Sequence, residues 1–435
     1  MFKKSRIFTA VLVFTMLFST IVSANPTLNN HGAWVAPDEN NPIELTIDKV
    51  LQMPIGTITP DATFEFSATP ITVDGIAYND DEDNPNMPQL NTNNMTVSFA
   101  DTDISGQPNS DNIISVTKTT NNMFAGVTFD HAGIYIYEIT ETGLTNPILD
   151  DEDNPHDFVR YSKAVYRIRV YVSNTADFTD TFVHAVGIFQ MNLDDGTEVV
   201  DDNGDVIEGG NKLPDITFTN DYVRTNGAVD PEDPDPVTES TLDVSKTVSG
   251  DLGNRERYFN FSLTLNIPIL VEDIPDYYRA YIVENGAVIN PADNADPSLI
   301  GTDDGGSYIQ ISTTAPTAFK LRHGQRLVFV DTPVGTSYTV NEAATPEYTP
   351  SFIITTNDVP GYKVEAETGA SLNTETQFVG HLTNRADFTN NRTSVVPTGL
   401  NINNLPFVWL IILAIGILVF YVAIKTSKRK NINGK

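Results

Sequence analysis

The feature that most constrains this chain is an internal duplication of short segments. On either side of a Pro- and acid-rich stretch at 226–240, the same landmarks recur in the same order. The pairs are IELTIDKVL (43–51) with TLDVSKTV (241–248), FEFS (64–67) with FNFS (259–262), YEITE (137–141) with YTVNE (338–342), and ITFTN (216–220) with GHLTN (380–384). A two-copy repeat of this length predicts two domains that share one fold.

The repeated segments have the pattern of β-strands. Apolar and polar residues alternate within runs of β-branched and aromatic residues, as in AVYRIRVYV (164–172), and Asp-Gly or Asn-Gly turns separate them. Outside the chain ends, no segment has the period of an amphipathic helix. We therefore predict an all-β fold with two tandem β-sandwich domains, at 25–222 and 241–386, joined by a linker at 223–240.

Three polar residues in each copy fall on the apolar face of their strand, because side chains at i and i+2 share a face. They are Lys49, Glu141 and Asn220 in the first copy, and Lys246, Glu342 and Asn384 in the second. Each residue alone could be a strand-end group that reaches solvent, or a buried polar group with its hydrogen bonds satisfied. The same triplet in both copies instead favours a shared chemical role.

These three residue types predict a covalent cross-link. Burial disfavours charge, so an inward lysine tends to become a neutral nucleophile, and an inward glutamate tends to stay protonated. A neutral lysine could then attack the asparagine carboxamide while glutamate polarises it and shuttles protons. Ammonia would leave and an isopeptide bond would remain. Each domain would do this once, so we predict no enzymatic turnover and no cofactor.

Both chain ends carry signals for export and membrane insertion. Basic residues before the apolar stretch 7–22, and small residues after it, predict a secretory signal peptide at 1–24. Near the other end, 407–424 carries no charge, and at about 1.5 Å per residue it matches the thickness of a bilayer core. The basic tail that follows predicts that the C-terminus stays cytoplasmic, so the two domains face outward.

Charge and composition exclude several function classes. The net charge of −31 opposes binding to nucleic acid, and without cysteine the chain has no disulfides. The acidic DDEDNP segments at 80–85 and 150–155 lack the glycine and downstream glutamate of an EF-hand loop, so we expect solvated loops rather than calcium sites. The sequence also predicts no other metal site, and no motif of a conventional enzyme stands out.

The order of these features resembles that of the streptococcal backbone pilins, over nearly the whole chain. The most specific stretch is the block from TVSGDLGNR to FNFSLTL at 247–265. The resemblance implies immunoglobulin-like (Cna B-type) domains, each with a Lys–Asn isopeptide bond assisted by a glutamate. The implied bonds are Lys49–Asn220 with Glu141, and Lys246–Asn384 with Glu342.

The segment 387–435 resembles a sortase sorting signal. Its motif, Val396-Pro397-Thr398-Gly399, precedes the apolar span and the basic tail. The resemblance implies that sortase cleaves after Thr398 and transfers the chain to an amine. Sortase, further copies of this chain and peptidoglycan are then the implied partners, on the surface of a Gram-positive cell. Val-Val-Pro-Thr-Gly differs from the commoner Leu-Pro-x-Thr-Gly, which leaves open which sortase acts; an unprocessed membrane-anchored protein is the alternative.

Polymerisation would also need an exposed acceptor lysine. The Tyr-Pro-Lys-Asn motif of many pilins is absent, but Lys212 in NKLPDITFTN stands where the closer relatives have their acceptor. Its spacing to Asn220 is about one residue longer than in those relatives. The alternative is an ordinary solvated lysine, in which case Lys163 and Lys118 are the next candidates.

Two functions are compatible with these features. The first is a structural shaft subunit of a sortase-assembled pilus. The second is a singly wall-anchored adhesin that binds a host or environmental ligand, although little chain remains for a ligand-binding domain. Minor pilins and a host ligand stay open as further partners.

Overall fold

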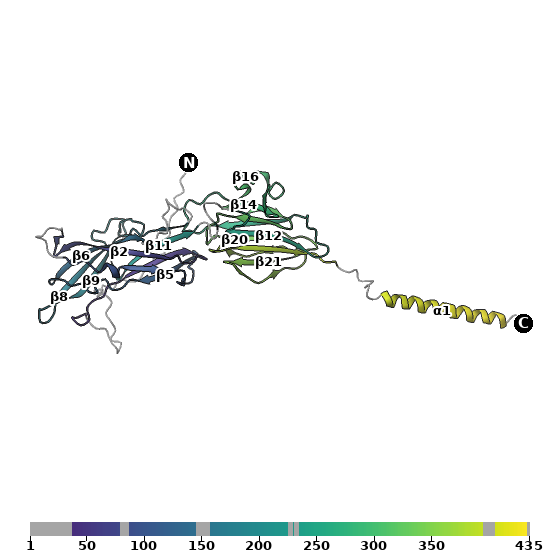
Figure 1. Cartoon of the computed structure of the whole chain (residues 1–435), viewed down its shortest axis with the longest axis horizontal. Helices are drawn as coiled ribbons and strands as arrows, with labels where there is room; N and C mark the ends of the chain where they lie inside the picture. Colours follow the sequence, from purple (N-terminus) through teal and green to yellow (C-terminus); the bar gives the residue numbers. More distant parts are fainter. Residues whose placement is uncertain are drawn as a thin grey trace.

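The computed structural model describes residues 37–78, 87–144, 157–224, 229, 235–394 and 405–432. Within these ranges, strands form two pairs of sheets, and one long helix, α1 (Leu405–Ile432), follows (Figure 1). The predicted all-β fold is confirmed. The predicted signal peptide, the motif at 396–399 and both DDEDNP segments lie outside the described residues.

The N-terminal domain consists of two facing sheets. One has the order β5 (Ile113–Thr119), β1 (Ile47–Pro54), β11 (Ile216–Arg224), β7 (Asp157–Arg160). The other has the order β10 (Asn211–Leu213), β9 (Thr181–Asn192), β8 (Val165–Asn174), β6 (Gly133–Leu144), β2 (Ala62–Val73), β3 (Ile76–Ala77), with β4 (Thr96–Phe99) paired to β2. The short 3₁₀ helix η1 (Thr92–Asn94) precedes β4. Apolar side chains of both sheets form one core.

The C-terminal domain repeats this plan around a separate core. Its larger sheet has the order β16 (Ile300–Asp303), β17 (Gly306–Ser312), β14 (Tyr277–Glu284), β19 (Gln325–Phe329), β12 (Leu242–Ser249), β26 (Arg385–Asn391), β21 (Thr349–Thr356), β22 (Val359–Pro360). In addition, β15 (Ala287–Ile289) pairs with β14, and β23 (Val364–Glu365) pairs with β21. The other has the order β18 (Thr317–Leu321), β13 (Phe259–Asn266), β20 (Ser337–Glu342), β24 (Leu372–Asn373), with β25 (Gln377–Phe378) also paired to β20. The 3₁₀ helix η2 (Pro297–Leu299) leads into β16.

The last strand of each domain runs beyond the boundary expected from the sequence. β11 continues to Arg224 rather than ending at 222, and β26 continues to Asn391 rather than 386. Residue Val229, within the expected linker, is buried against Tyr281 and Tyr308 of the C-terminal domain. Residues 223–224 of the predicted linker are therefore part of a strand, and Val229 packs on the C-terminal domain.

First and last strands lie side by side in both domains. β1 pairs in parallel with β11, and β12 pairs in parallel with β26. In the first pair Lys49 lies opposite Phe218, and in the second Lys246 lies opposite Phe388. This arrangement brings residues from the two ends of a domain's sequence to the same place in its core.

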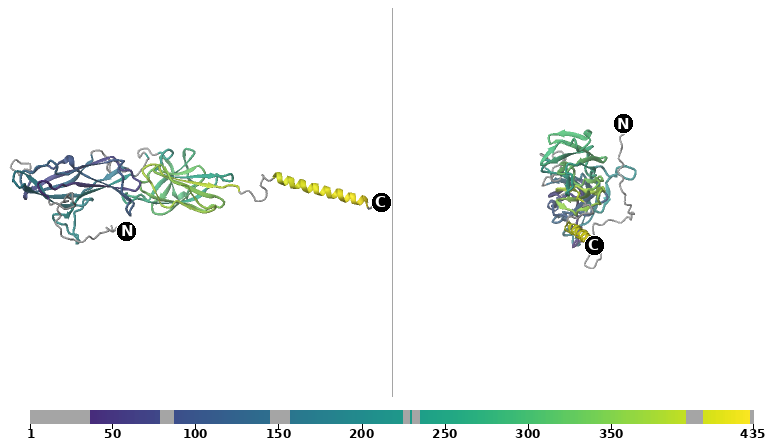
Figure 2. Two further views of the ribbon diagram at one scale, coloured as in Figure 1. Left: turned by 90° about the horizontal axis from the view of Figure 1, so that it is seen from below. Right: turned by 90° about the vertical axis from the view of Figure 1, so that its right-hand side faces the viewer.

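The two domains lie end to end and touch through a close backbone contact (Figures 1 and 2). The Arg224 carbonyl accepts a hydrogen bond from the Val334 N–H, and the Gly56 carbonyl accepts one from the His381 N–H. Gly335 has a φ of +83°, and a Cβ added there would collide with Pro54 of the other domain. Glycine is needed at this position for both its backbone conformation and the closeness of the contact.

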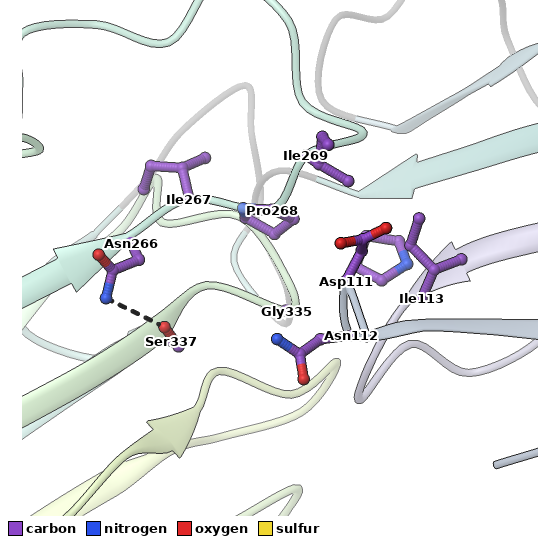
Figure 3. Close-up of a pocket in the computed structure, with 10 residues that line it drawn as sticks. Asp111, Asn112, Ile113, Asn266, Ile267, Pro268, Ile269, Gly335 and Ser337 are labelled. Atoms are coloured by element: carbon purple, nitrogen blue, oxygen red, sulfur yellow. Dashed lines mark hydrogen bonds between the residues drawn. The ribbon is translucent and has the colours of Figure 1, made fainter. Parts of the chain in front are cut away.

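A cavity at this junction is lined by both domains. The loop at 111–113 faces the segment 266–269, and Gly335 and Ser337 line the side between them (Figure 3). Asn266 Nδ2 donates a hydrogen bond to Ser337 Oγ at 3.3 Å. Asp111 is the only titratable residue among those that line the cavity, so the cavity offers no pair of groups for acid–base chemistry.

The junction should weaken in acid through His381. Its Nδ1 accepts a hydrogen bond from the Ile58 N–H of the other domain. Burial, aided by the nearby Arg224, lowers the pKa of His381 from 6.5 to about 4. A protonated Nδ1 cannot accept this bond. Because the pKa is lowered in the folded chain, the contribution of His381 to stability is complete above pH 6.5 and is lost progressively as pH falls to about 4.

Small-angle scattering between pH 7 and 4 would measure this loss as greater freedom between the domains. The matched variant is His381→Gln, which cannot titrate and should show a smaller change across the same range. An identical pH response in the wild type and the variant would contradict the role given to His381.

The helix α1 contains one stretch, Phe407–Thr426, that is long and apolar enough to cross a membrane. It includes the predicted span 407–424, and its side chains from 407 to 426 are exposed. These features fit the predicted membrane anchor.

Candidate functional site: two buried lysine centres

In the N-terminal domain, the three predicted residues meet in the core. Lys49 comes from β1, Asn220 from β11, and Glu141 from β6 of the facing sheet. Lys49 Nζ lies 3.0 Å from Glu141 Oε2, and Asn220 Nδ2 donates a hydrogen bond to Glu141 Oε1 at 2.9 Å. Lys49 and Asn220 are fully buried, so the carboxyl of Glu141 bridges an amine and a carboxamide away from solvent.

Strand register explains this meeting. Lys49 pairs with Phe218, and Asn220 lies two residues further along the same face of β11. On the other sheet, Glu141 pairs with Phe66 next to a register shift in β2. The ring of Phe64 covers the amine, with its centroid 4.7 Å from Lys49 Nζ. The core thus gives the amine an apolar wall and a direct hydrogen bond to the carboxyl of Glu141.

Burial moves both titratable groups of this centre towards their neutral forms. It lowers the pKa of Lys49 from 10.5 to about 8, against the opposing effect of Glu141. It raises the pKa of Glu141, against the opposing effects of Lys49, Asn220 and the Ser162 N–H. A neutral amine is the form that can act as a nucleophile, and a neutral carboxyl can donate a proton.

The C-terminal domain contains a second centre of the same composition. Lys246 Nζ of β12 lies 2.7 Å from Glu342 Oε1 of β20. The same oxygen accepts a hydrogen bond from Asn390 Nδ2 at 2.7 Å, and all three residues are buried. Burial lowers the pKa of Lys246 to about 8 and raises that of Glu342.

The prediction that Asn384 belongs to this centre is wrong. Asn384 lies outside it, just before β26, with its carboxamide fully used by backbone groups. Its Nδ2 donates to the carbonyls of Thr241, Gly380 and Leu382, and its Oδ1 accepts from the N–H groups of Gly380 and Asn357. These hydrogen bonds of Asn384 fix the backbone at the start of β26, which is a structural role.

The asparagine that lies in this centre is Asn390, and the sequence contains a signal for it. The letters FTN occur at 218–220 and again at 388–390, whereas the predicted match used LTN at 382–384. Asn384 would share an apolar face with Phe378 only if one strand covered 378–384, but β25 ends at Phe378 and the next strand, β26, begins at Arg385. In the observed register Asn390 lies two residues beyond Phe388, as Asn220 does beyond Phe218.

The predicted acceptor, Lys212, is exposed on β10, opposite Phe189 of β9. Of the other two candidates, Lys163 is also exposed, whereas Lys118 is partly buried and lies 2.6 Å from Asp103 in an ion pair. Accessibility thus favours Lys212 and Lys163 over Lys118. No group of three or more His, Cys, Asp or Glu residues arranged to hold a metal ion is found within the described parts of the chain.

Comparison with known proteins gives similarities along most of the chain. Residues 240–392 match a family described as "Domain of unknown function (DUF7601)". A protein named "Pilin" from Streptococcus pyogenes serotype M1 is 26% identical over 404 residues, which cover 90% of this chain and 92% of the relative. This relative confirms the similarity to a streptococcal pilin that the sequence features predicted.

Solved structures give weaker similarities. The crystal structure of the major pilin from Streptococcus pyogenes is 20% identical, covers 81% of this chain and 99% of its own, and has a TM-score of 0.30. The major pilin protein T3.2 from the same species is 18% identical, with coverages of 79% and 97% and a TM-score of 0.30. A pilus-presented adhesin, Cpa, is 15% identical, with coverages of 53% and 37% and a TM-score of 0.22. The scores are too low for these structures to inform the function of this chain.

Proposed function

We propose that this chain is the structural shaft subunit of a covalent surface pilus, and that each domain closes its own Lys–Asn isopeptide bond. The observation that carries the proposal is the buried Lys-Glu-Asn centre, which occurs twice in the same strand register. The similarity to a protein named Pilin along 90% of the chain supports the same reading. The proposed bonds are Lys49–Asn220 and Lys246–Asn390.

Neutral lysine begins the proposed reaction by attacking the Cγ of the asparagine carboxamide. As a C–N bond forms from Nζ to Cγ, the protonated glutamate gives its proton to the departing amino group, and the proton that the amine loses returns to the glutamate. The original C–N bond breaks, ammonia leaves, and the glutamate ends in the protonated form in which it began. The products are one amide and one ammonia, so no cofactor or oxidant is needed, and each centre reacts only once.

An amide bond of this kind suits a shaft subunit that has no cysteine. The cross-link joins the first and last strands of a domain, so neither strand can detach from the other. In the C-terminal domain, whose two ends lead to the other domain and to the sorting motif, a pull along the chain would meet the Lys246–Asn390 bond before it could separate β12 from β26.

The proposed assembly uses the ends of the chain. After export and removal of the signal peptide, the α1 segment would hold the chain in the membrane next to sortase. Sortase would cleave between Thr398 and Gly399 and pass the Thr398 carbonyl to Lys212 of another copy, or finally to peptidoglycan. Lys212 is exposed, whereas Lys49 and Lys246 are buried and would be consumed within their domains.

A denaturing gel of cell-wall extracts tests this function. Covalent polymers of the chain would give a ladder of high-mass bands. A single band at the mass of one subunit would instead support the singly anchored adhesin.

The intact mass of the two-domain region tests the bonds. We expect it to be lower than the sequence mass by two ammonia molecules. Asn390→Ala should restore one of them, because it removes the electrophile of the C-terminal centre. Asn384→Ala is the matched control and should keep both losses, since Asn384 bonds only to backbone groups. If Asn384→Ala restores an ammonia and Asn390→Ala does not, the assignment of Asn390 is wrong.

A further inference from the structure

The two centres differ at the oxygen of the carboxamide. In the N-terminal centre, Asn220 Oδ1 accepts a hydrogen bond from the Ser162 N–H at 2.7 Å. In the C-terminal centre, Asn390 Oδ1 is buried without a hydrogen-bond partner, within a domain described throughout from 235 to 394. The lysine, glutamate and asparagine are common to both centres, so the backbone donor is an addition in one of them.

The Ser162 N–H is held in place by its own side chain. Ser162 is buried in the loop between β7 and β8, and its Oγ donates to Asp194 Oδ1 at 2.5 Å. The same Asp194 oxygen accepts the N–H of Thr219, the residue before Asn220, at 3.0 Å. The Asp194 carbonyl also accepts the Lys163 N–H at 2.8 Å. Asp194 therefore ties the loop to β11 beside the reacting carboxamide.

A hydrogen-bond donor beside Asn220 Oδ1 would act when Lys49 attacks the carboxamide of Asn220. As the bond from Lys49 Nζ to Asn220 Cγ forms, the π electrons of the carboxamide move onto Oδ1, which becomes an oxyanion. A preorganised N–H within about 2.7–3.1 Å of such an oxygen stabilises the transition state, and loss of one such donor typically costs on the order of 10²–10³ in rate. The electron pair on Oδ1 forms the C=O π bond again when the C–N bond to the leaving ammonia breaks, and the negative charge on Oδ1 disappears.

We propose that the Ser162 N–H is the oxyanion donor of the N-terminal centre, a catalytic group beyond the lysine, glutamate and asparagine. The inference rests on the proposed isopeptide bond. Asp194 and the Ser162 hydroxyl are positioning groups, because their hydrogen bonds go to each other and to backbone N–H groups such as that of Thr219 rather than to the reacting atoms.

The test replaces one backbone N–H group with an ester oxygen. The full chain is made in a cell-free system with detergent, and Ser162 is replaced by its α-hydroxy analogue, which turns the amide into an ester and deletes the N–H. Samples quenched at intervals are digested, and the Lys49–Asn220 and Lys246–Asn390 cross-linked peptides are followed by mass spectrometry. The Lys246–Asn390 bond forms in the same molecule, so its rate serves as an internal reference.

We expect the ester to slow the Lys49–Asn220 bond on the order of 10²-fold, with the Lys246–Asn390 rate unchanged. Ser162→Ala is the matched control. It keeps the N–H and loses the hydroxyl contacts with Asp194 and with the Ala164 N–H, so its effect should be smaller than tenfold. Ser162→Pro provides a second deletion of the N–H, and resistance of each variant to protease in a Lys49→Ala background reports whether its N-terminal domain still folds.

Each remaining outcome has one meaning. If the ester variant closes the Lys49–Asn220 bond at the wild-type rate, the oxyanion donor is refuted while the bond itself stands. If the ester only shifts the pH dependence of the rate, the N–H acts on the pKa of Glu141 and the proposal is also overturned. If the wild type forms neither cross-link, the isopeptide chemistry of the proposed function fails instead.

Discussion

Replacing Lys49 with alanine is expected to lower the melting temperature of the N-terminal domain by roughly 10–20 °C. The bond to Asn220 joins the first strand of the domain to its last, so it closes a loop over most of the domain. By analogy with a disulfide that closes a loop of 100 residues or more, its loss costs on the order of 4–5 kcal/mol of unfolding free energy. Calorimetry on the two-domain region would measure the shift, and Lys246→Ala should lower the transition of the C-terminal domain in the same way.

A second variant separates the bond from the packing of the lysine. Glu141→Gln keeps the size of the side chain but removes the proton shuttle, so it should lower the same transition and restore one ammonia to the mass. Lys212→Ala is the control, since Lys212 is exposed and outside both centres. Melting of Lys49→Ala and Glu141→Gln at the wild-type temperature would mean that the bond is absent or contributes nothing.

Deleting Thr398, or replacing Lys212 with alanine, is expected to abolish the ladder of covalent polymers in wall extracts. Thr398 supplies the carbonyl and Lys212 the amine of the proposed link between subunits, so either change removes one reactant. Because Lys212 is exposed and lies on the short strand β10, the Lys212→Ala subunit should still fold and keep both internal bonds. A gel of wall extracts, together with the intact mass of the mutant monomer, measures both effects.

Lys163→Ala is the matched control, because Lys163 is the other exposed candidate in this domain. We expect it to leave the ladder intact. A ladder that survives Lys212→Ala and disappears in Lys163→Ala would move the acceptor to Lys163. A wild-type extract with one band, unaffected by any lysine substitution, would replace the shaft subunit with the anchored adhesin.

Much of the N-terminal centre could be predicted because its evidence is local. Alternation along a strand decides which face a residue occupies, and this alone placed Lys49, Glu141 and Asn220 on apolar faces. The second copy then supplied Lys246 and Glu342 by the same argument. Five of the six predicted residues lie in a centre, since period and repeat are properties of short segments.

The sixth predicted residue, Asn384, shows where an argument from local sequence pattern fails. Two Thr-Asn pairs, at 383–384 and 389–390, lie close together, and both follow an apolar residue. Only the parallel pairing of β12 with β26 decides between them, because it sets Lys246 opposite Phe388 and so brings Asn390 within reach. Pairing between strands far apart in the chain depends on the whole domain, and a one-residue change of register would turn the other face inward.

The sequence by itself determined that this protein contains two copies of one β fold, with a lysine and a glutamate turned inward in each, and it predicts that the chain is exported. Composition, period and repeat carry that information because they reside in neighbouring residues. The tertiary structure alone decided which asparagine faces Lys246, that the Ser162 N–H points at Asn220, and that His381 and Gly335 form the junction of the domains. Those contacts join segments separated by tens to hundreds of residues, and only the packing of the sheets brings them together.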